Sequence, residues 1–260
     1  MAGTSYADRL LQEYGITAPQ EIDLDAIAFD KGALIKYRRL DGCEARIIGK
    51  ENRAIISVDP RPIATRQRFS AAHELAHWLL DRGNISFLCK KSDIGPQKTE
   101  GNGAEARANG LAAQLLMPDY LFRPRANKRP LTLDTVADLA KQFRTSHTST
   151  AIRLTQVGSY PGMVVCFSTS KREWFFRGPD VPDVFWPVRE LDADSQAFEL
   201  LYGEDKKTRP LKVGAETWID RYDAHEYTIT EHSMKVSSDS VLTLLWWQDE
   251  KQINNLEVRG

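Results

Sequence analysis

Apolar residues recur three or four positions apart along two long segments of the chain, and this spacing predicts two strong amphipathic helices. The first helix is expected to begin after Pro62 and to continue to Gly83, a residue type that favours the end of a helix. The second is expected to run from Ala104 to Met117, where Pro118 stops it. Weaker patterns predict shorter helices over residues 5–14, 22–32, 131–143, 150–158 and 192–201.

Strand-length runs of β-branched and apolar residues occupy two other parts of the chain. Short polar turns separate the first three runs, so we expect them to form a small antiparallel meander: residues 33–40, 44–50 and 53–59. Four further runs predict a separate α+β unit after residue 158: residues 163–168, 173–177, 226–232 and 240–247. The polar stretches 83–103 and 124–130 are expected to be connections.

The segment 131–158 has the outline of two short helices joined by a tight polar turn, which is a helix-turn-helix-like arrangement. Arg144 and Arg153 are its only basic residues from the turn onward. Since base reading in DNA needs more donors than this, we favour packing or partner docking as the role of the segment.

Composition and charge exclude several classes of protein. The formal net charge of -1 over 260 residues gives no general attraction to nucleic acid or anionic membranes. No apolar stretch approaches the roughly 18–20 residues that span a bilayer, and the N-terminus lacks the pattern of a secretory leader. Cys43, Cys89 and Cys166 form no CxxC pair, which is typical of a reducing compartment and argues against a cysteine zinc site. We therefore expect a cytoplasmic protein without a membrane partner.

The first strong helix carries the chemistry in the sequence HELAH, residues 73–77. His73 and His77 are four residues apart, so both rings project from one helical face and can bind one ion. Glu74 lies about 100° away around the helix, beside such an ion, where it can take a proton from an activated water. A chance match occurs in on the order of one per cent of chains of this size, but the apolar helical context favours a zinc peptidase site.

A catalytic zinc needs a third protein ligand. The acidic residues downstream of the histidines leave four candidates: Asp81, Asp93, Glu100 and Glu105. Glu105 opens the second strong helix, and a rigid helix is a better platform for a ligand than a loop. An acidic residue in the first turn of a helix also complements the helix dipole, so the residues alone leave Glu100 open as the alternative.

The sequences RQRFSAAHELAHWLL and EARANGLAAQLLMP together resemble the ImmA/IrrE family of metallopeptidases. The resemblance covers roughly residues 5–158. It implies that His73, His77 and Glu105 are the zinc ligands and that Glu74 is the general base. It also suggests Asn109, one turn after Glu105, as a residue that supports the ligands or packs beside them.

Two positions depart from the family pattern, because Leu111 replaces a usual phenylalanine and Gly110 a larger residue. Neither is a ligand, so the departures concern helix packing. The expected fold is α+β, with a zincin-like metallopeptidase core containing a small antiparallel sheet at 1–128. A helix-turn-helix-like segment follows at 129–158 and a C-terminal α+β domain at 159–260. Longer family members carry a GAF-like sensory domain in the last region, and the tail is a candidate for a shortened counterpart.

The resemblance implies a zinc-dependent endopeptidase, with Mn²⁺ as an alternative ion, that cleaves a helix-turn-helix transcriptional repressor and so relieves repression. The alternative is a regulatory protein without proteolytic activity that binds a repressor or DNA. Tyr120 and His147 are candidates for the group that stabilises the oxyanion. The intact set of ligands and base favours the peptidase, since a binding module has no need of Glu74.

Overall fold

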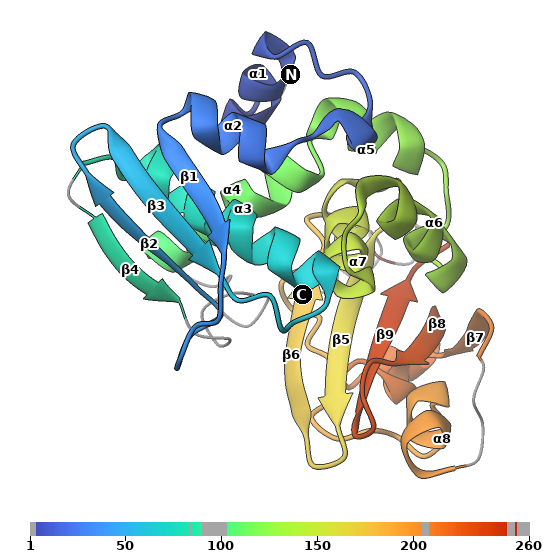
Figure 1. Cartoon of the computed structure of the whole chain (residues 1–260). Coiled ribbons are helices and arrows are strands. Elements are labelled where there is room, and N and C mark those ends of the chain that lie inside the picture. The colour runs from blue at the N-terminus through green and yellow to red at the C-terminus, as the bar shows by residue number, and fades with distance from the viewer. Residues whose placement is uncertain (1–3, 84, 90–102, 204–207, 249–252, 254–260) are drawn as a thin grey trace. The chain divides into compact units, whose positions relative to one another are not determined.

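The computed structural model describes residues 4–83, 85–89, 103–203, 208–248 and 253 (Figure 1). The chain divides into two units, one made of residues 1–125 and 140–149 and the other of residues 126–139 and 150–260. Helices and two sheets occur among the described residues, so the prediction of an α+β fold is confirmed. The division of the sequence into three functional parts stays a prediction.

The first unit contains a four-stranded sheet with the order β1-β3-β2-β4. Its strands are β1 (Ala33–Tyr37), β2 (Ala45–Lys50), β3 (Arg53–Val58) and β4 (Ile85–Cys89). β2 is antiparallel to β3 and to β4, whereas β1 is parallel to β3. The prediction of a simple antiparallel meander is therefore wrong for β1. The segment 83–103, expected to be a connection, contributes β4 to the edge of the sheet.

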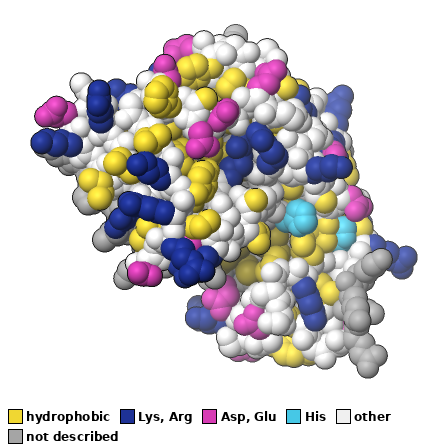
Figure 2. All heavy atoms as spheres, viewed as in Figure 1, with side chains coloured by type: hydrophobic (Ala, Val, Ile, Leu, Met, Phe, Trp, Pro, Cys, Tyr) yellow, Lys and Arg dark blue, Asp and Glu magenta, His cyan; other side chains and the backbone are white. Residues whose placement is uncertain are grey.

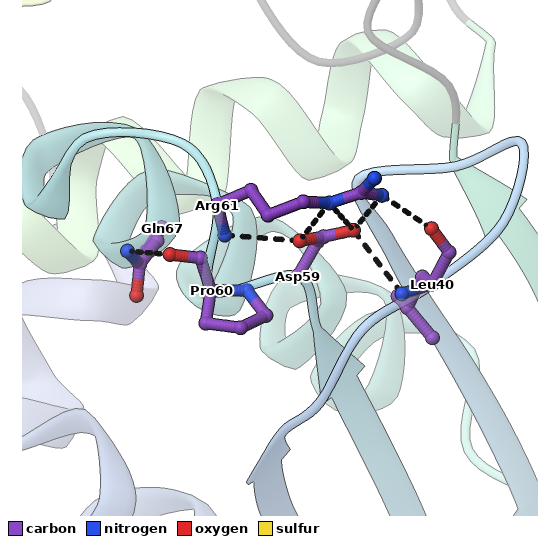
Figure 3. A network of polar contacts seen from close by, with 5 residues as sticks. All are labelled: Leu40, Asp59, Pro60, Arg61 and Gln67. Carbon is purple, nitrogen blue, oxygen red and sulfur yellow. Dashed lines mark hydrogen bonds and ion pairs between the residues drawn. The ribbon is translucent and has the colours of Figure 1, made fainter.

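The connection between β1 and β2 is bonded to the end of β3. The Asp59 carboxylate, just after β3, accepts a hydrogen bond of 3.1 Å from the Leu40 backbone N–H (Figure 3). Arg61 binds the same carboxylate and donates to the Leu40 carbonyl at 2.6 Å. These bonds hold the connection at the end of β3, so the chain passes β3 before it returns as β2.

Helices cover one face of this sheet. The long helix α3 (Ala64–Leu80) packs against the sheet and against α4 (Ala104–Leu116). Both agree closely with the helices expected from the apolar pattern. The other helices of the unit are α1 (Tyr6–Glu13), η1 (Pro19–Glu21), α2 (Leu24–Asp30) and α5 (Asp119–Ala126).

Helix α5 corrects the prediction that residues 124–130 are a plain connector. The helix contains Pro124, which cannot donate a backbone hydrogen bond. Packing compensates, since Phe122 is fully buried and its ring lies 5.1 Å from that of Phe143. Burial of an aromatic side chain thus outweighs the local signal of the proline.

Two helices follow in the sequence, α6 (Leu133–Phe143) and α7 (His147–Val157). The helical pair was expected, although α7 begins three residues earlier than predicted. Arg144 adopts a positive φ of 54° directly after α6, which turns the chain sharply enough to shorten the connection. A helix-turn-helix function for the pair stays a prediction.

The second unit contains a five-stranded antiparallel sheet of order β6-β5-β9-β8-β7. Its elements are β5 (Gly162–Ser168), β6 (Arg172–Arg177), α8 (Gln196–Tyr202), β7 (Leu211–Gly214), η3 (Ala215–Thr217), η4 (Ala224–Glu226), β8 (Thr228–Lys235) and β9 (Ser240–Trp246). Trp246 and Trp247 are both buried, and the ring of Trp247 stacks on Phe185 at 5.5 Å. These tryptophans belong to the core, as expected from their apolar strand.

A buried polar group also lies in this core. Glu231 has no exposed surface, and burial raises the pKa of its carboxyl group. Its oxygens accept hydrogen bonds from the Trp218 indole at 2.8 Å and from the Gln196 backbone N–H at 3.1 Å. Both carboxylate oxygens therefore have a donor, as a buried acidic side chain requires.

The sequence led us to expect neither a membrane-spanning segment nor a disulfide framework. In the part of the chain that the structure describes, no helix combines the length and apolarity needed to cross a membrane. Cys43 and Cys166 are free thiols. The cytoplasmic location stays a prediction from the sequence.

Candidate metal centre

His73 and His77 lie one turn apart on α3, and their rings meet. Both side chains are 0% exposed. The ring centroids are 4.7 Å apart with the planes at 84°, and the two Nε2 atoms are separated by 3.1 Å. The two imidazoles therefore present nitrogen atoms to the same point.

Glu105, in the first turn of α4, brings a carboxylate to these nitrogen atoms. Its Oε2 atom lies 3.1 Å from Nε2 of His73 and 3.5 Å from Nε2 of His77. The packing of α4 on α3 produces this approach, and buried alanines on both helices allow it: Ala72, Ala76, Ala108 and Ala112. Glu105 keeps 31% of its side chain exposed, so the cluster has one solvated side.

Asn109 fixes the orientation of the first histidine. Its Oδ1 atom lies 2.9 Å from Nδ1 of His73, and the residue is only 5% exposed. With the amide oxygen as acceptor, Nδ1 carries the proton and Nε2 keeps its lone pair toward the cluster. Metal-binding histidines usually donate their second nitrogen in this way.

The donor set suits a zinc ion. A tetrahedral centre with bonds of ~2.0–2.1 Å separates neighbouring donor atoms by roughly 3.3–3.4 Å. The pairs of donor atoms here are 3.1, 3.1 and 3.5 Å apart, and all lie within 4.8 Å of one another. Two histidines and one carboxylate are also the ligands of catalytic zinc sites that leave a fourth position for substrate or water.

Residues 22–155, just over half of the chain, match the model of the Peptidase M78 family, described as the IrrE N-terminal-like domain. The chain belongs to this family. The resemblance to the ImmA/IrrE metallopeptidases is thereby confirmed, and with it the membership of a peptidase family.

One solved structure that resembles this IrrE-family chain is described as a Mycobacterium tuberculosis transcriptional regulator. It has a TM-score of 0.58 and 12% sequence identity, and the match covers 92% of this chain and 85% of that chain. At this identity the likeness shows the fold alone. The comparison with curated proteins gives no match.

Electrostatics keep His77 of this IrrE-family chain suitable as a ligand. Burial lowers the pKa of His77, and the neighbouring Glu105 carboxylate only partly opposes that effect. The neutral imidazole, which is the form that binds metal, is therefore favoured at neutral pH.

Glu74 follows His73 on α3 and has no exposed surface. Its charge also affects the pKa of Cys43, which lies in the connection between β1 and β2. The pKa of Cys43 is raised mainly by burial, lowered by Arg46 and raised by Glu74. Cys43 thus lies within electrostatic range of the candidate base. No sequence motif connects Cys43 to HELAH, so the residue pattern gives no signal of this proximity.

The metal-binding group found among the described residues contains none of the other candidates. Asp81 lies 3.6 Å from Arg107 in an ion pair, and Asp93 and Glu100 fall outside the described residues. Tyr120 donates its hydroxyl hydrogen bond to the Ile16 carbonyl at 2.8 Å. His147 is exposed at the first position of α7. Stabilisation of an oxyanion by Tyr120 or His147 stays a prediction.

Proposed function

We propose that the chain is a zinc-dependent endopeptidase, with a zincin-like core, that cleaves a helix-turn-helix transcriptional repressor in the cytoplasm. The observation that carries the proposal is the convergence of His73, His77 and Glu105 beside Glu74. Their donor atoms lie within 4.8 Å of one another on two packed helices. Membership of a peptidase family supports the same reaction.

The residues divide the chemistry between them. His73, His77 and Glu105 would hold Zn²⁺, or Mn²⁺ in its place, and Asn109 would keep the His73 ring in position. The bound ion supplies Lewis acidity, which acidifies water and polarises the peptide carbonyl. Glu74 accepts the proton of the attacking water and then delivers it to the amine nitrogen of the departing peptide. Glu74 is completely buried, so proton exchange with bulk solvent would not compete with delivery of the proton to the amine nitrogen.

The nature of the substrate rests on the family alone. The resemblance to ImmA/IrrE peptidases implies a repressor as the target. Cleavage that separates DNA binding from dimerisation would relieve repression.

A comparison of the Glu74→Gln variant with the wild type tests the proposal. Purified protein loaded with Zn²⁺ or Mn²⁺ is mixed with a repressor encoded beside it, and fragments are followed by mass spectrometry. We expect Glu74→Gln to bind the metal with unchanged stoichiometry while cleavage falls about 10²–10⁴-fold. Cleavage at the wild-type rate would contradict the role of Glu74.

Metal titration separates the site from the mechanism. Calorimetry should give one ion per wild-type chain and none with His77→Ala at the same concentrations. If the wild type binds no metal, the ligand set is wrong. If the wild type and Glu74→Gln both bind metal and relieve repression equally well, the chain acts by binding the repressor or DNA rather than by cleavage.

A further inference from the structure

The outward face of the first sheet carries an apolar row. Side chains alternate between the two faces of a strand, and the exposed positions of β1, β3 and β2 include Leu34, Ile55 and Ile48. The register pairs Leu34 with Ile55 and Ile55 with Ile48, so the three residues form one row across the sheet. Their exposed fractions are 45%, 44% and 53%.

This row is separate from the hydrophobic core. The alternate positions of the same strands, among them Ile35, Ile47 and Ile56, are buried on the side that packs against α3. Strand propensity accounts for single isoleucines on a solvated face. It does not account for three large apolar residues in one cross-strand row, which is the pattern of an interaction surface.

Within strands β1, β2 and β3, the charged residues that accompany the apolar row are all positive. The exposed face of these strands also carries Lys36, Arg46, Lys50 and Arg53, and Arg38 continues it just beyond β1 with its Nε donating to Ser57 at 3.1 Å. The segments 33–37, 45–50 and 53–58 contain no Asp or Glu. Figure 2 shows apolar and basic side chains side by side over this part of the surface. The net charge of the whole chain is -1, so this local excess of cations is not a general property of the surface.

We propose that this face, called the basic sheet face and defined by Leu34, Ile48, Ile55 and the five basic residues around them, docks an acidic, amphipathic segment of a partner protein. Apolar side chains of the segment would cover the central row, and its carboxylates would meet the flanking lysines and arginines. Such a segment satisfies both features of the face at once.

The chemistry disfavours other occupants. A second copy of the same face would bring cations of like charge together, which costs binding energy. Single-stranded nucleic acid uses aromatic side chains for base stacking, and the exposed row here is aliphatic. An acidic protein segment is therefore the occupant that charge and side-chain type favour together. The proposal does not depend on the peptidase function.

The test uses the full-length chain and a synthetic helical peptide with leucines on one face and glutamates on the other. Binding is measured by fluorescence anisotropy and located by NMR chemical shifts. We expect the peptide to shift the amides of β1, β2 and β3. The double variant Ile48→Asp/Ile55→Asp should weaken binding at least about tenfold. The double variant Lys50→Glu/Arg53→Glu should weaken it and reduce its dependence on salt.

Ile63→Asp is the matched control, because Ile63 is 73% exposed but lies outside the three strands. It should bind the peptide like the wild type, and circular dichroism should show all variants folded. A peptide with the leucines replaced by glutamine should bind at least about tenfold more weakly. The proposal would be overturned if the wild type did not bind the peptide, or if the peptide shifted amides outside β1, β2 and β3. Equal binding of the peptide by the wild type and by Ile48→Asp/Ile55→Asp would also overturn it. Tighter binding of duplex DNA or of phosphatidylglycerol vesicles to the same face would overturn the choice of partner.

Discussion

Replacement of Asn109 by alanine is the most direct test of how the proposed metal site is held together. The amide oxygen of Asn109 lies 2.9 Å from Nδ1 of His73, and the residue is 5% exposed. Water therefore has little access to replace the lost acceptor. Loss of such a supporting hydrogen bond typically lowers metal affinity 10–100-fold, or about 1.4–2.8 kcal/mol of binding free energy. We expect Asn109→Ala to show a zinc dissociation constant raised by this factor.

The effect cannot come from a weaker helix. Alanine has a higher helix propensity than asparagine, so the substitution should favour α4 itself. The metal-free variant should nevertheless lose about 1–3 kcal/mol of unfolding free energy, because the buried N–H of His73 loses its acceptor. Asn109→Asp keeps an acceptor at the same place and should retain more of the affinity than Asn109→Ala.

Competition with a chromophoric zinc chelator at fixed pH measures the dissociation constants. Gln114→Ala is the control, since it removes an amide from the same helix at a partly exposed position five residues later. It should bind zinc like the wild type. If Asn109→Ala also binds zinc as tightly as the wild type, the hydrogen bond does not position His73, and the argument for its role fails.

Three further predictions concern the rest of the molecule. Gly32→Ala should lower the free energy of unfolding, measured in urea, by more than about 2 kcal/mol, because φ at Gly32 is +82° and a Cβ would lie 2.3 Å from a backbone oxygen. Gly15→Ala should lower it by about 1 kcal/mol, because φ at Gly15 is +69° but a Cβ would meet open space. Arg61 holds the pKa of the Asp59 carboxyl group well below its usual range. The ionised Asp59 therefore stabilises the fold fully above the unfolded pKa of about 3.9, and this stabilisation is lost as the pH falls further and the carboxylate is protonated. The stability deficit of Asp59→Asn should therefore be largest near pH 7 and shrink below about pH 4. Burial raises the pKa of Cys166 to about 11, so about one thiol in a thousand is ionised at pH 8. Because only the thiolate reacts, alkylation of Cys166 in the native protein should be slow, and mass spectrometry can follow it.

Local pattern predicted those parts of the fold that local interactions determine. Helices α3 and α4 bury continuous apolar faces, so their spacing alone indicated their type and their extent to within a few residues. Strands β5, β6, β8 and β9 of the second unit were also predicted, because β-branched and apolar runs mark them. The four-residue edge strand β7 (Leu211–Gly214) was missed, because it is too short to show a pattern of its own. The positions of His73, Glu74 and His77 relative to one another follow from helical geometry without any tertiary information.

Strand order could not be predicted in the same way, because bonds distant in sequence determine it. The parallel pairing of β1 with β3 brings Leu40, after β1, to Asp59, which follows β3 and lies 19 residues later in the sequence. An aspartate after a strand has many other roles, and nothing local identifies its partner. The same limit explains why β4 was missed, since an edge strand is defined by its neighbour β2.

Glu105, the proposed third ligand, shows how a second residue helps to interpret an ambiguous one. A glutamate in the first turn of a helix complements the helix dipole whether or not it binds a metal, so Glu105 alone carries little information. Asn109 changes this, because it lies one turn later on the same side of α4 and is buried. The two residues contact opposite nitrogen atoms of one ring, Glu105 at Nε2 and Asn109 at Nδ1 of His73. A residue that served only the helix dipole would need no such partner, whereas a ligand set that must hold an imidazole in one orientation requires contact on both sides of the ring.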